Sequence, residues 1–303
     1  MLVSIIIPFY KGNLYINRTL SCIENNVNYC SIHDDIRISI ETIIINDYPD
    51  EDVILEKEYR GCHLSIYKNK ENCGIHFSRV RGINLAKGKY VILLDQDDMI
   101  KDNALYSQCQ AIKEGDIVFS DGYIEDLRNG VMKQFTIFRN KIVAPYILNI
   151  NTYLCADNPI ISPGQVLMKR TSIPIAWMQH ILKENGSDDL LLWILFLSDD
   201  KKAYYNSDIL YIHKYTGANY SLNNLRMLNS DKKVYELLKN NKLISSKHLK
   251  RFSENILYKS LKLDNDAKMM KYLQCKRVIL YRVVYRFIRG IGKGLYILKK
   301  IIN

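Results

Sequence analysis

The chain has 303 residues, of which 48% are hydrophobic and 25% charged, and its formal net charge is +11. These fractions are those of a globular protein and exclude an intrinsically disordered chain. No uncharged apolar stretch reaches the length of about 18 residues that a membrane-spanning helix needs. The seven cysteines are odd in number and contain no Cys-x-x-Cys pair, which argues against a zinc site and a disulfide framework.

The positive charge is concentrated at the C-terminal end. Residues 276–303 contain eight Lys or Arg and no Asp or Glu, so they contribute +8 of the +11, and the other 275 residues contribute +3. The body of the protein is therefore nearly neutral. The apolar start at 1–8 lacks the cationic residues and the length of a secretory signal and is expected to form a strand.

Strand-like and helix-like segments alternate over residues 1–120. Short apolar runs indicate buried strands, and apolar residues spaced three or four apart indicate helices. This alternation predicts an α/β protein with a mostly parallel sheet flanked by helices. The predicted strands are 3–7, 36–45, 63–67, 90–94 and 116–119, and the predicted helices are 14–23, 50–59, 75–86 and 103–113.

The pattern changes in the second half of the chain. Between 121 and 221, loops rich in Asn, Pro and Gly surround short apolar segments, whereas the region from 222 to 303 has a helical pattern throughout. We therefore predict one domain at 1–221, with halves at 1–120 and 121–221, followed by a helical C-terminal region at 222–303.

The predicted strand at 90–94 ends at three carboxylates, Asp95, Asp97 and Asp98. In an open α/β sheet, ligands bind beyond the carboxyl ends of the strands. Carboxylate oxygens suit Mg²⁺ or Mn²⁺ that carries a substrate phosphate. The alternative is a solvated acidic turn that also caps the next helix. The acidic run by itself leaves both interpretations open.

Four separated segments form an ordered set of motifs. They are, in turn, the strand that ends in Pro8-Phe9-Tyr10; Ile43-Ile44-Ile45-Asn46-Asp47; the group Asn72-Cys73-Gly74, Arg79, Gly82, Ala86-Lys87-Gly88 and Asp95-Gln96-Asp97-Asp98; and Asp188-Asp189 followed by Leu192-Trp193.

In this order and spacing the segments resemble the family 2 glycosyltransferases with the GT-A fold, over roughly residues 2–221. The resemblance implies a Rossmann-like sheet, with a nucleotide-binding half at 1–120 and an acceptor-binding half at 121–221. It implies inverting transfer of a sugar from a nucleotide-diphosphate donor, expected to be UDP-linked, to a hydroxyl of a lipid-linked or polysaccharide acceptor. Synthesis of a bacterial surface glycan would place the protein in the cytoplasm, at the inner face of the plasma membrane.

The resemblance also assigns residues to the donor. Pro8 and Tyr10 are expected beside the nucleotide, where Tyr10 either offers an aromatic face to the base or packs inside. Asp47 is expected to bind the base or the ribose, with a turn or cap as its alternative. Arg79 is expected near the diphosphate, in preference to Arg81, because residues two apart do not share a helical face.

Asp95 and Asp97 form the family's Asp-x-Asp motif. By resemblance, Asp97 binds Mn²⁺ or Mg²⁺ across the two phosphates, Asp95 contacts the ribose or the metal, and Gln96 lies in the same donor site. His213 resembles a histidine that completes the metal site, although a lone histidine is more often structural. For Asp98, metal ligation and capping of the following helix both stay open.

Asp189 is the predicted general base, because a carboxylate can take the proton of an attacking sugar hydroxyl. A single displacement with one base gives inversion at the sugar carbon. Asp188 is the rival, and capping of a helix at 190–197 is the alternative role for the pair. The departures Lys11, Tyr48-Pro49 and Val80 from the family pattern bear on which donor fits.

The basic tail has an amphipathic pattern. Arg282, Arg286, Arg289 and Lys293 follow one helical face, and a second face is apolar. Such a helix is predicted to lie on an anionic membrane surface. The alternative is a helix packed on the body with a solvated basic face, and no nucleic-acid-binding module accompanies the charge.

Two other functions remain as alternatives. A sugar nucleotidyltransferase would also use a parallel sheet with acidic metal ligands, but it would need a Gly-rich basic loop after the first strand, which Pro8-Phe9-Tyr10-Lys11-Gly12 does not supply. A non-enzymatic, membrane-associated nucleotide-sugar binder would not need the acidic residues that this sequence contains.

Overall fold

The computed structural model describes residues 1–33, 35–126, 133–136, 141–183, 185–199, 201–215, 220–264 and 269–302. The chain divides into two compact units. Unit 1 comprises Met1–Ile137, Ile161–Ile173 and Lys201–Gly217, and unit 2 comprises Phe138–Ile160, Pro174–Asp200 and Ala218–Asn303. The units interleave along the sequence, so the region from 121 to 221 is shared between them.

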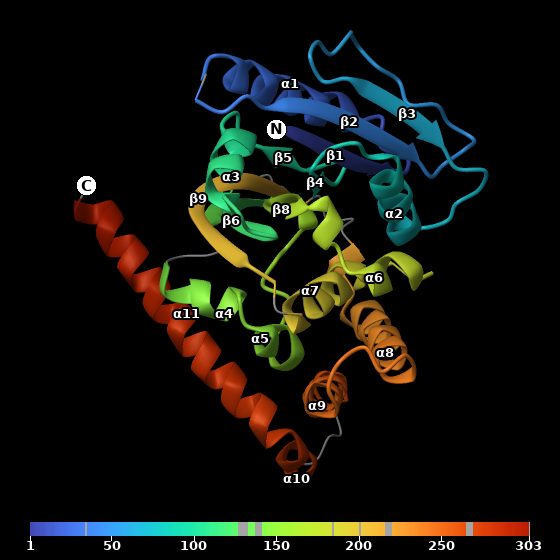
Figure 1. The fold of residues 1–303 in the computed structure, drawn as a ribbon. Coiled ribbons are helices and arrows are strands. Elements are labelled where there is room, and N and C mark those ends of the chain that lie inside the picture. Colours follow the sequence, from blue (N-terminus) through green and yellow to red (C-terminus); the bar gives the residue numbers. More distant parts are fainter. Residues whose placement is uncertain are drawn as a thin grey trace. The chain divides into compact units, whose positions relative to one another are not determined.

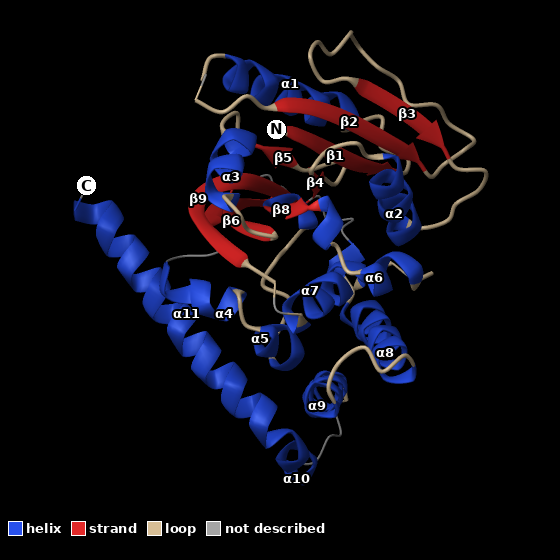
Figure 2. Ribbon diagram, viewed as in Figure 1, coloured by secondary structure: helices blue, strands red, loops and turns tan. Residues whose placement is uncertain are grey.

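Unit 1 is built on one mixed sheet (Figures 1 and 2). Strands β1 to β4 are parallel wherever they pair with one another. Strands β6 (Ile117–Asp126) and β9 (Ala203–Tyr215) also pair in parallel. Strand β8 (Val166–Lys169) joins the two sets, because it pairs antiparallel with both β4 (Tyr90–Leu93) and β6. The predicted α/β fold with a mostly parallel sheet is therefore confirmed. The order is β3 (Leu64–Lys68), β2 (Ser39–Asn46), β1 (Leu2–Phe9), β4 (Tyr90–Leu93), β8 (Val166–Lys169), β6 (Ile117–Asp126), β9 (Ala203–Tyr215) and β5 (Met99–Ile100), with β7 (Lys133–Thr136) paired to β6.

Strand β1 is apolar on both faces because both faces of the sheet are covered. Its alternate residues Val3, Ile5, Ile7 and Phe9 share one core cluster with residues of helix α1 (Ile16–Ser31) and helix α3 (Ala104–Ile112). On the opposite face, helix α2 (Ile75–Leu85) packs on β1. A strand covered on both faces has a continuous apolar sequence, which is why β1 could be predicted from the sequence.

Gly82 sets how closely α2 approaches the sheet. A Cβ atom at this position would come within 2.3 Å of Ile6 Cγ2 in β1. We expect Gly82→Ala to lower the free energy of unfolding by about 1–3 kcal/mol, because the core must shift to admit the methyl group. Guanidinium denaturation of the full chain would measure this, and Gly82→Ala should cost less in an Ile6→Ala background, because alanine lacks the Cγ2 atom that the new methyl group would meet. A Gly82→Ala protein as stable as wild type would contradict the close packing.

The predicted helix at 50–59 is wrong, because no helix forms there. The backbone of this segment is instead paired with two side chains near α1. Asn13 accepts from the Ile54 N–H and donates to the Asp52 carbonyl, at 2.9 Å each. Asn17 donates to the Ile54 carbonyl and accepts from the Glu56 N–H, also at 2.9 Å. These bonds satisfy the peptide groups without helical pairing.

Unit 2 is helical in its described residues. Helix α7 (Asp188–Ser198) is its central element, with every residue from Leu190 to Phe196 buried. Such an all-apolar helix belongs inside a core. The predicted helices of the region 222–303 are confirmed. The helices are α4 (Ala144–Ile147), α5 (Ile150–Cys155), α6 (Ile175–Gln179), α7 (Asp188–Ser198), α8 (Asn224–Asn240), α9 (Ser246–Leu263), α10 (Met269–Tyr272) and α11 (Lys276–Ile302).

Helix α11 presents a different face to solvent from the one predicted. Arg282 is buried within unit 2, at 5% exposure, so its placement on an exposed basic face is wrong. Arg286 and Arg289 are exposed, and the side chain of Lys293 lies outside the described residues. The exposed surface of the helix also carries large apolar residues. No helix in the described part of the chain combines the length and the apolar character needed to cross a membrane.

Candidate active site

The donor-side residues lie at one edge of the sheet in unit 1. Phe9 of β1 pairs with Asn46 of β2, and Ile6 of β1 pairs with Leu93 of β4, all in parallel. The three strands therefore end at the same edge, where α/β proteins bind their ligands. Tyr10 and Asp47 follow the ends of β1 and β2 directly, and Asp95–Asp98 begin one residue further on from the end of β4.

The Gln96 side chain holds the backbone of the loop after β1 by two hydrogen bonds. Its Oε1 accepts from the Tyr10 N–H at 2.8 Å, and its Nε2 donates to the Tyr10 carbonyl at 2.9 Å. Strand β1 extends through Pro8 to Phe9, which is buried, while the Tyr10 ring is exposed. The Tyr10 ring makes an edge contact with the Tyr48 ring, with centroids 5.4 Å apart. Two aromatic rings thus stand at the ends of β1 and β2.

Asp47 is buried and accepts three hydrogen bonds. Its Oδ1 accepts from Asn69 Nδ2 at 2.6 Å and the Cys73 N–H at 2.8 Å, and its Oδ2 accepts from the Gly74 N–H at 2.8 Å. Asp47 therefore holds the loop that leads into α2. This is close to its alternative assignment as a turn residue, and its contact with a base or ribose stays a prediction.

Arg79 and Asp95 form a partly buried ion pair at the same edge. Arg79 Nη2 donates to Asp95 Oδ1 at 2.6 Å, and Ser162 Oγ donates to Asp95 Oδ2 at 2.9 Å. The Arg79 side chain is almost wholly buried. Both oxygens of Asp95 are thus engaged, and the guanidinium is held rigidly where a diphosphate is predicted.

Asp97 is in an electrostatically unfavourable position. Desolvation and the neighbouring charges of Asp98 and Asp95 raise its pKa from 3.8 to about 7. An acidic group disfavoured in this way gains from a nearby cation. Asp97 is therefore the carboxylate in this run with the greatest need of a counter-ion.

Asp98 and His213 form a buried pair. His213 Nδ1 lies 2.9 Å from Asp98 Oδ1, which also accepts from the Lys214 N–H at 3.0 Å, and Tyr211 donates to Asp98 Oδ2. Desolvation lowers the pKa of His213, but the charge of Asp98 and the hydrogen bond to it outweigh this, so the pKa lies above 6.5. Asp98 does not cap α3, whose N-cap residue is Asn103. It joins the acidic run to β9.

The residues at this edge suit a divalent cation shared with a ligand. No cluster of three or more His, Cys, Asp or Glu side chains with metal-binding geometry occurs in the described part of the chain. Asp97, with its raised pKa, offers hard oxygen ligands of the type Mg²⁺ and Mn²⁺ prefer. A His213 ring with its proton on Nδ1 would leave Nε2 as a second ligand. Phosphate oxygens and water would have to complete the coordination.

Asp188 and Asp189 begin α7 in unit 2, and their environments differ. Asp188 is buried and its carbonyl accepts from Trp177 Nε1 at 2.8 Å, whereas Asp189 is only partly buried. Asp189 Oδ2 accepts from Asn158 Nδ2 at 2.7 Å, and its Oδ1 accepts from the Leu190 N–H at 2.7 Å. Asp189 is thus the better placed of the two to meet a substrate hydroxyl.

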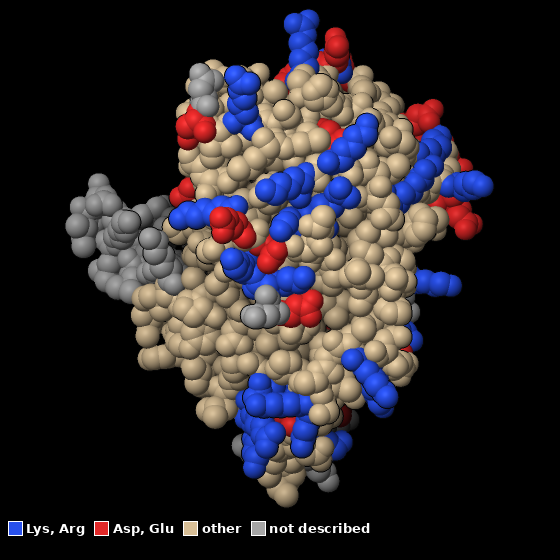
Figure 3. Space-filling model, viewed as in Figure 1, with Lys and Arg blue, Asp and Glu red and all other residues tan. Residues whose placement is uncertain are grey.

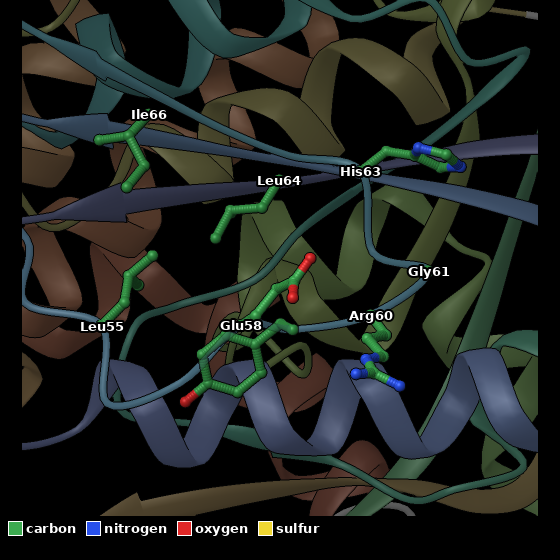
Figure 4. Close-up of a pocket in the computed structure, with 8 residues that line it drawn as sticks. Leu55, Glu58, Arg60, Gly61, His63, Leu64 and Ile66 are labelled. Carbon is green, nitrogen blue, oxygen red and sulfur yellow. The ribbon is translucent and has the colours of Figure 1, made fainter.

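A hollow of about 780 Å³ lies elsewhere in unit 1, between β3 and the segment before it (Figure 4). Apolar and charged side chains line it together, and none of the predicted site residues does. We assign no role to this hollow. Its lining residues are Leu55, Glu58, Tyr59, Arg60, Gly61, His63, Leu64 and Ile66.

Three residues that contact the predicted site were not predicted from sequence. Tyr48 was noted only as a departure from the family pattern, although an aromatic residue directly after a strand end is a usable signal. Ser162 and Asn158 reach Asp95 and Asp189 from 67 and 31 residues away in sequence. No local pattern marks such partners.

A mostly parallel sheet with carboxylates, an arginine and aromatic rings at its carboxyl edge is typical of nucleotide-binding α/β proteins. Residues 4–173 match the model described as Glycosyl transferase family 2, and the chain belongs to this family. The resemblance drawn from its motifs is confirmed.

Relatives and solved structures agree with this membership. An uncharacterized glycosyltransferase of Methanocaldococcus jannaschii is 25% identical over 167 residues, which cover 53% of this chain and 55% of the relative. The poly(ribitol-phosphate) beta-N-acetylglucosaminyltransferase TarP of Staphylococcus aureus is 26% identical over 218 residues, or 69% of this chain and 61% of TarP. The chain thus spans about half to two thirds of these relatives.

The fold matches a solved structure over almost its full length. Residues 1–349 of S. aureus TarS, solved in complex with UDP-GlcNAc, superpose with a TM-score of 0.60 at 15% identity. The match covers 98% of this chain and 89% of that one. This likeness confirms the GT-A-like fold.

Proposed function

We propose that this protein is an inverting glycosyltransferase that moves a sugar from a UDP-sugar to a hydroxyl of a lipid-linked or polysaccharide acceptor in synthesis of a bacterial surface glycopolymer. The main support is the edge of the sheet where the Arg79–Asp95 pair, Asp97 and the Tyr10 ring lie. The relative TarP, named for transfer to poly(ribitol phosphate), and the TarS complex with UDP-GlcNAc favour this donor and this class of acceptor.

The donor diphosphate is assigned to Arg79 and the acidic run. Asp97, with Asp95 and His213, would hold Mn²⁺ or Mg²⁺, which supplies charge neutralisation for the departing UDP. Arg79 adds a fixed positive charge beside the same phosphates. The Tyr10 and Tyr48 rings offer apolar surface to the base, and Gln96 holds Tyr10 in place.

The acceptor hydroxyl is assigned to Asp189. Its carboxylate would accept the hydroxyl proton while the oxygen attacks the anomeric carbon and the bond to the UDP oxygen breaks. A single displacement from the face opposite the leaving group inverts the anomeric configuration. The hydrogen bonds from Asn158 and from the Leu190 N–H orient the Asp189 carboxylate for this role.

The proposal is tested by donor binding followed by turnover. UDP-GlcNAc with Mn²⁺ should raise the melting temperature, because a ligand that binds the native state stabilises it by mass action. UDP release should then depend on added poly(ribitol phosphate) or on another glycopolymer of the same class. If no UDP-sugar stabilises the protein and none is turned over with any such acceptor, the proposed function is wrong.

We further propose that α11 rests on an anionic membrane surface. The large apolar residues Leu280, Val284, Phe287 and Ile291 are 42–68% exposed and are spaced four, three and four apart, which places them on one face. Lys276, Arg277 and Arg286 are exposed on the same helix. Figure 3 shows Lys and Arg side chains gathered at the lower end of the view, where Figure 1 places α9, α10 and the start of α11. Apolar surface flanked by cations suits an interfacial helix at the inner face of the plasma membrane.

The double variant Leu280→Glu/Phe287→Glu should bind vesicles containing phosphatidylglycerol at least about tenfold more weakly than wild type, because two large side chains no longer enter the lipid. Vesicle co-sedimentation at fixed ionic strength measures this. Ile54→Glu, which changes an exposed apolar residue of unit 1, is the control and should bind as wild type does. Undiminished binding of the double variant would assign the exposed face of α11 another role.

A further inference from the structure

Asn158 fixes the orientation of the Asp189 carboxylate. Its Nδ2 donates to Asp189 Oδ2 at 2.7 Å, while its Oδ1 accepts from the Ile160 N–H at 3.1 Å. The backbone donor at Ile160 decides which way the amide points, because only the amide oxygen can accept that bond. The amide nitrogen is thereby directed to Asp189.

The residue before Asn158 is clamped by the C-terminal helix. Arg282 of α11 binds Asp157 with both terminal nitrogens, Nη1 to Oδ2 at 3.1 Å and Nη2 to Oδ1 at 3.0 Å. Arg282 Nη2 also donates to Asn255 Oδ1 of α9 at 3.0 Å and to the Ala156 carbonyl. The guanidinium lies 4.7 Å from the centroid of the Tyr258 ring. A buried arginine bound in this bidentate way holds the 156–157 backbone in one place.

A second set of contacts reaches the start of α7. Lys259 of α9 lies 3.8 Å from Asp157 Oδ1 and 2.8 Å from Asp231 Oδ2 of α8. Asp231 Oδ1 accepts from Ser187 Oγ at 2.8 Å, and Ser187 immediately precedes α7. The backbone before Asp189 and the side chain beside it are therefore held by one polar network within unit 2.

We propose that Asn158 is a positioning residue for the general base Asp189, and that Arg282 of α11 acts through Asp157 to hold Asn158 in place. This inference rests on the proposed function, in which Asp189 accepts the acceptor proton. Misplacement of a reacting group by about 1 Å is enough to cost about 100-fold in rate. Arg282, although it is buried within unit 2, thereby has a catalytic consequence.

The test compares Asn158→Ala with wild type in steady-state UDP release from UDP-GlcNAc, with poly(ribitol phosphate) as the acceptor. We expect kcat to fall about 10- to 100-fold, with the KM for UDP-GlcNAc unchanged, because Asn158 contacts the base and the donor residues are left as they are. The acidic limb of the kcat–pH profile should move to higher pH, because a hydrogen bond to the charged carboxylate has been lost. Asn241→Ala, which removes an asparagine at the end of α8, is the matched control and should leave both unchanged.

The pH profile has identifiable contributors near Asp189. Asp188 lies on its own helix, Tyr153 lies on α5, and Asp231 of α8 reaches the same helix start through Ser187. Burial raises the pKa of Tyr153 well above 10, so it stays neutral over the assay range. A shift in Asn158→Ala that is absent in Asn241→Ala is therefore assigned to the lost donor.

Arg282 is tested by Arg282→Gln and Arg282→Lys. We expect Arg282→Gln to lower kcat, as Asn158→Ala does. Arg282→Lys should lower kcat less, since lysine keeps the positive charge but lacks the two terminal nitrogens that bind both oxygens of Asp157. If Arg282→Gln does not fold, the Asn158 variant decides the question. If Asn158→Ala keeps the wild-type kcat and pH profile while Asp189→Asn is inactive, the positioning role is wrong and the proposed function stands. If Asp189→Asn is fully active, Asp189 is not the general base, and both the positioning role and that part of the proposed function are wrong.

Discussion

Asp189→Asn is expected to lower kcat about 10²- to 10⁴-fold, the usual contribution of a general base. Asparagine keeps the size of the side chain but cannot accept the hydroxyl proton. Stabilisation by UDP-GlcNAc with Mn²⁺ should persist, because the donor residues lie in unit 1 and are unchanged. Single-turnover UDP release with acceptor present measures the loss, and a melting curve with donor confirms that the site still binds.

Two neighbouring variants make this result specific. Asp199→Asn changes an exposed carboxylate at the other end of α7 and should behave as wild type. Asp188→Asn should retain most of the activity if Asp189 is the base, because Asp188 is buried. If Asp188→Asn is inactive while Asp189→Asn is active, Asp188 and not Asp189 is the general base.

Asp97→Asn is expected to abolish metal-dependent transfer while making the metal-free protein more stable. The loss of activity follows from losing the carboxylate with the greatest need of a cation. The gain in stability follows because the pKa of Asp97 is raised from 3.8 to about 7 by desolvation and by Asp98 and Asp95. Mn²⁺ should raise the melting temperature of wild type in the presence of UDP, and should have no such effect on the variant.

The stability gain has a defined pH dependence. An aspartate whose folded pKa is raised contributes stability below its unfolded pKa and loses that contribution as the pH rises through its folded pKa. The metal-free wild type should therefore lose stability between about pH 4 and pH 7 relative to Asp97→Asn. At about pH 8 the variant should be more stable by about 2–4 kcal/mol, from about 1.4 kcal/mol for each unit of pKa shift.

Asp52→Asn is the control for this pair of effects. Its side chain is 85% exposed in unit 1, so its replacement should change neither the activity nor the pH dependence of the melting temperature. If Asp97→Asn has the same melting temperature as wild type at every pH, the pKa of Asp97 is not raised by its neighbours. Full activity in the variant would remove Asp97 from the metal site.

Strands β1 and β4 and the start of β6 were predictable because they are buried apolar runs. The runs in β1 and β4 and at the end of β2 (Ile43–Ile45) are almost wholly apolar, and each is followed within two residues by residues of the candidate site. The helix predicted at 50–59 was wrong because three acidic residues at the start of this segment resemble the first turn of a helix. The hydrogen bonds that decide the path of its backbone come from Asn13 and Asn17, outside the segment. The predicted exposure of Arg282 was wrong because helical spacing gives the faces of a helix but does not show which face packs on the body.

The sequence by itself determined the family, the α/β fold and the carboxylates that carry the proposed chemistry, because these depend on local patterns and on motif order. Only the tertiary structure decided how each residue is engaged. It showed that Arg79 and Ser162 bind both oxygens of Asp95, that burial and the charges of Asp98 and Asp95 raise the pKa of Asp97, and that Asp98 binds His213. Hydrogen bonds and electrostatic fields act between residues far apart in the chain, and their strength depends on burial, which only the folded chain defines.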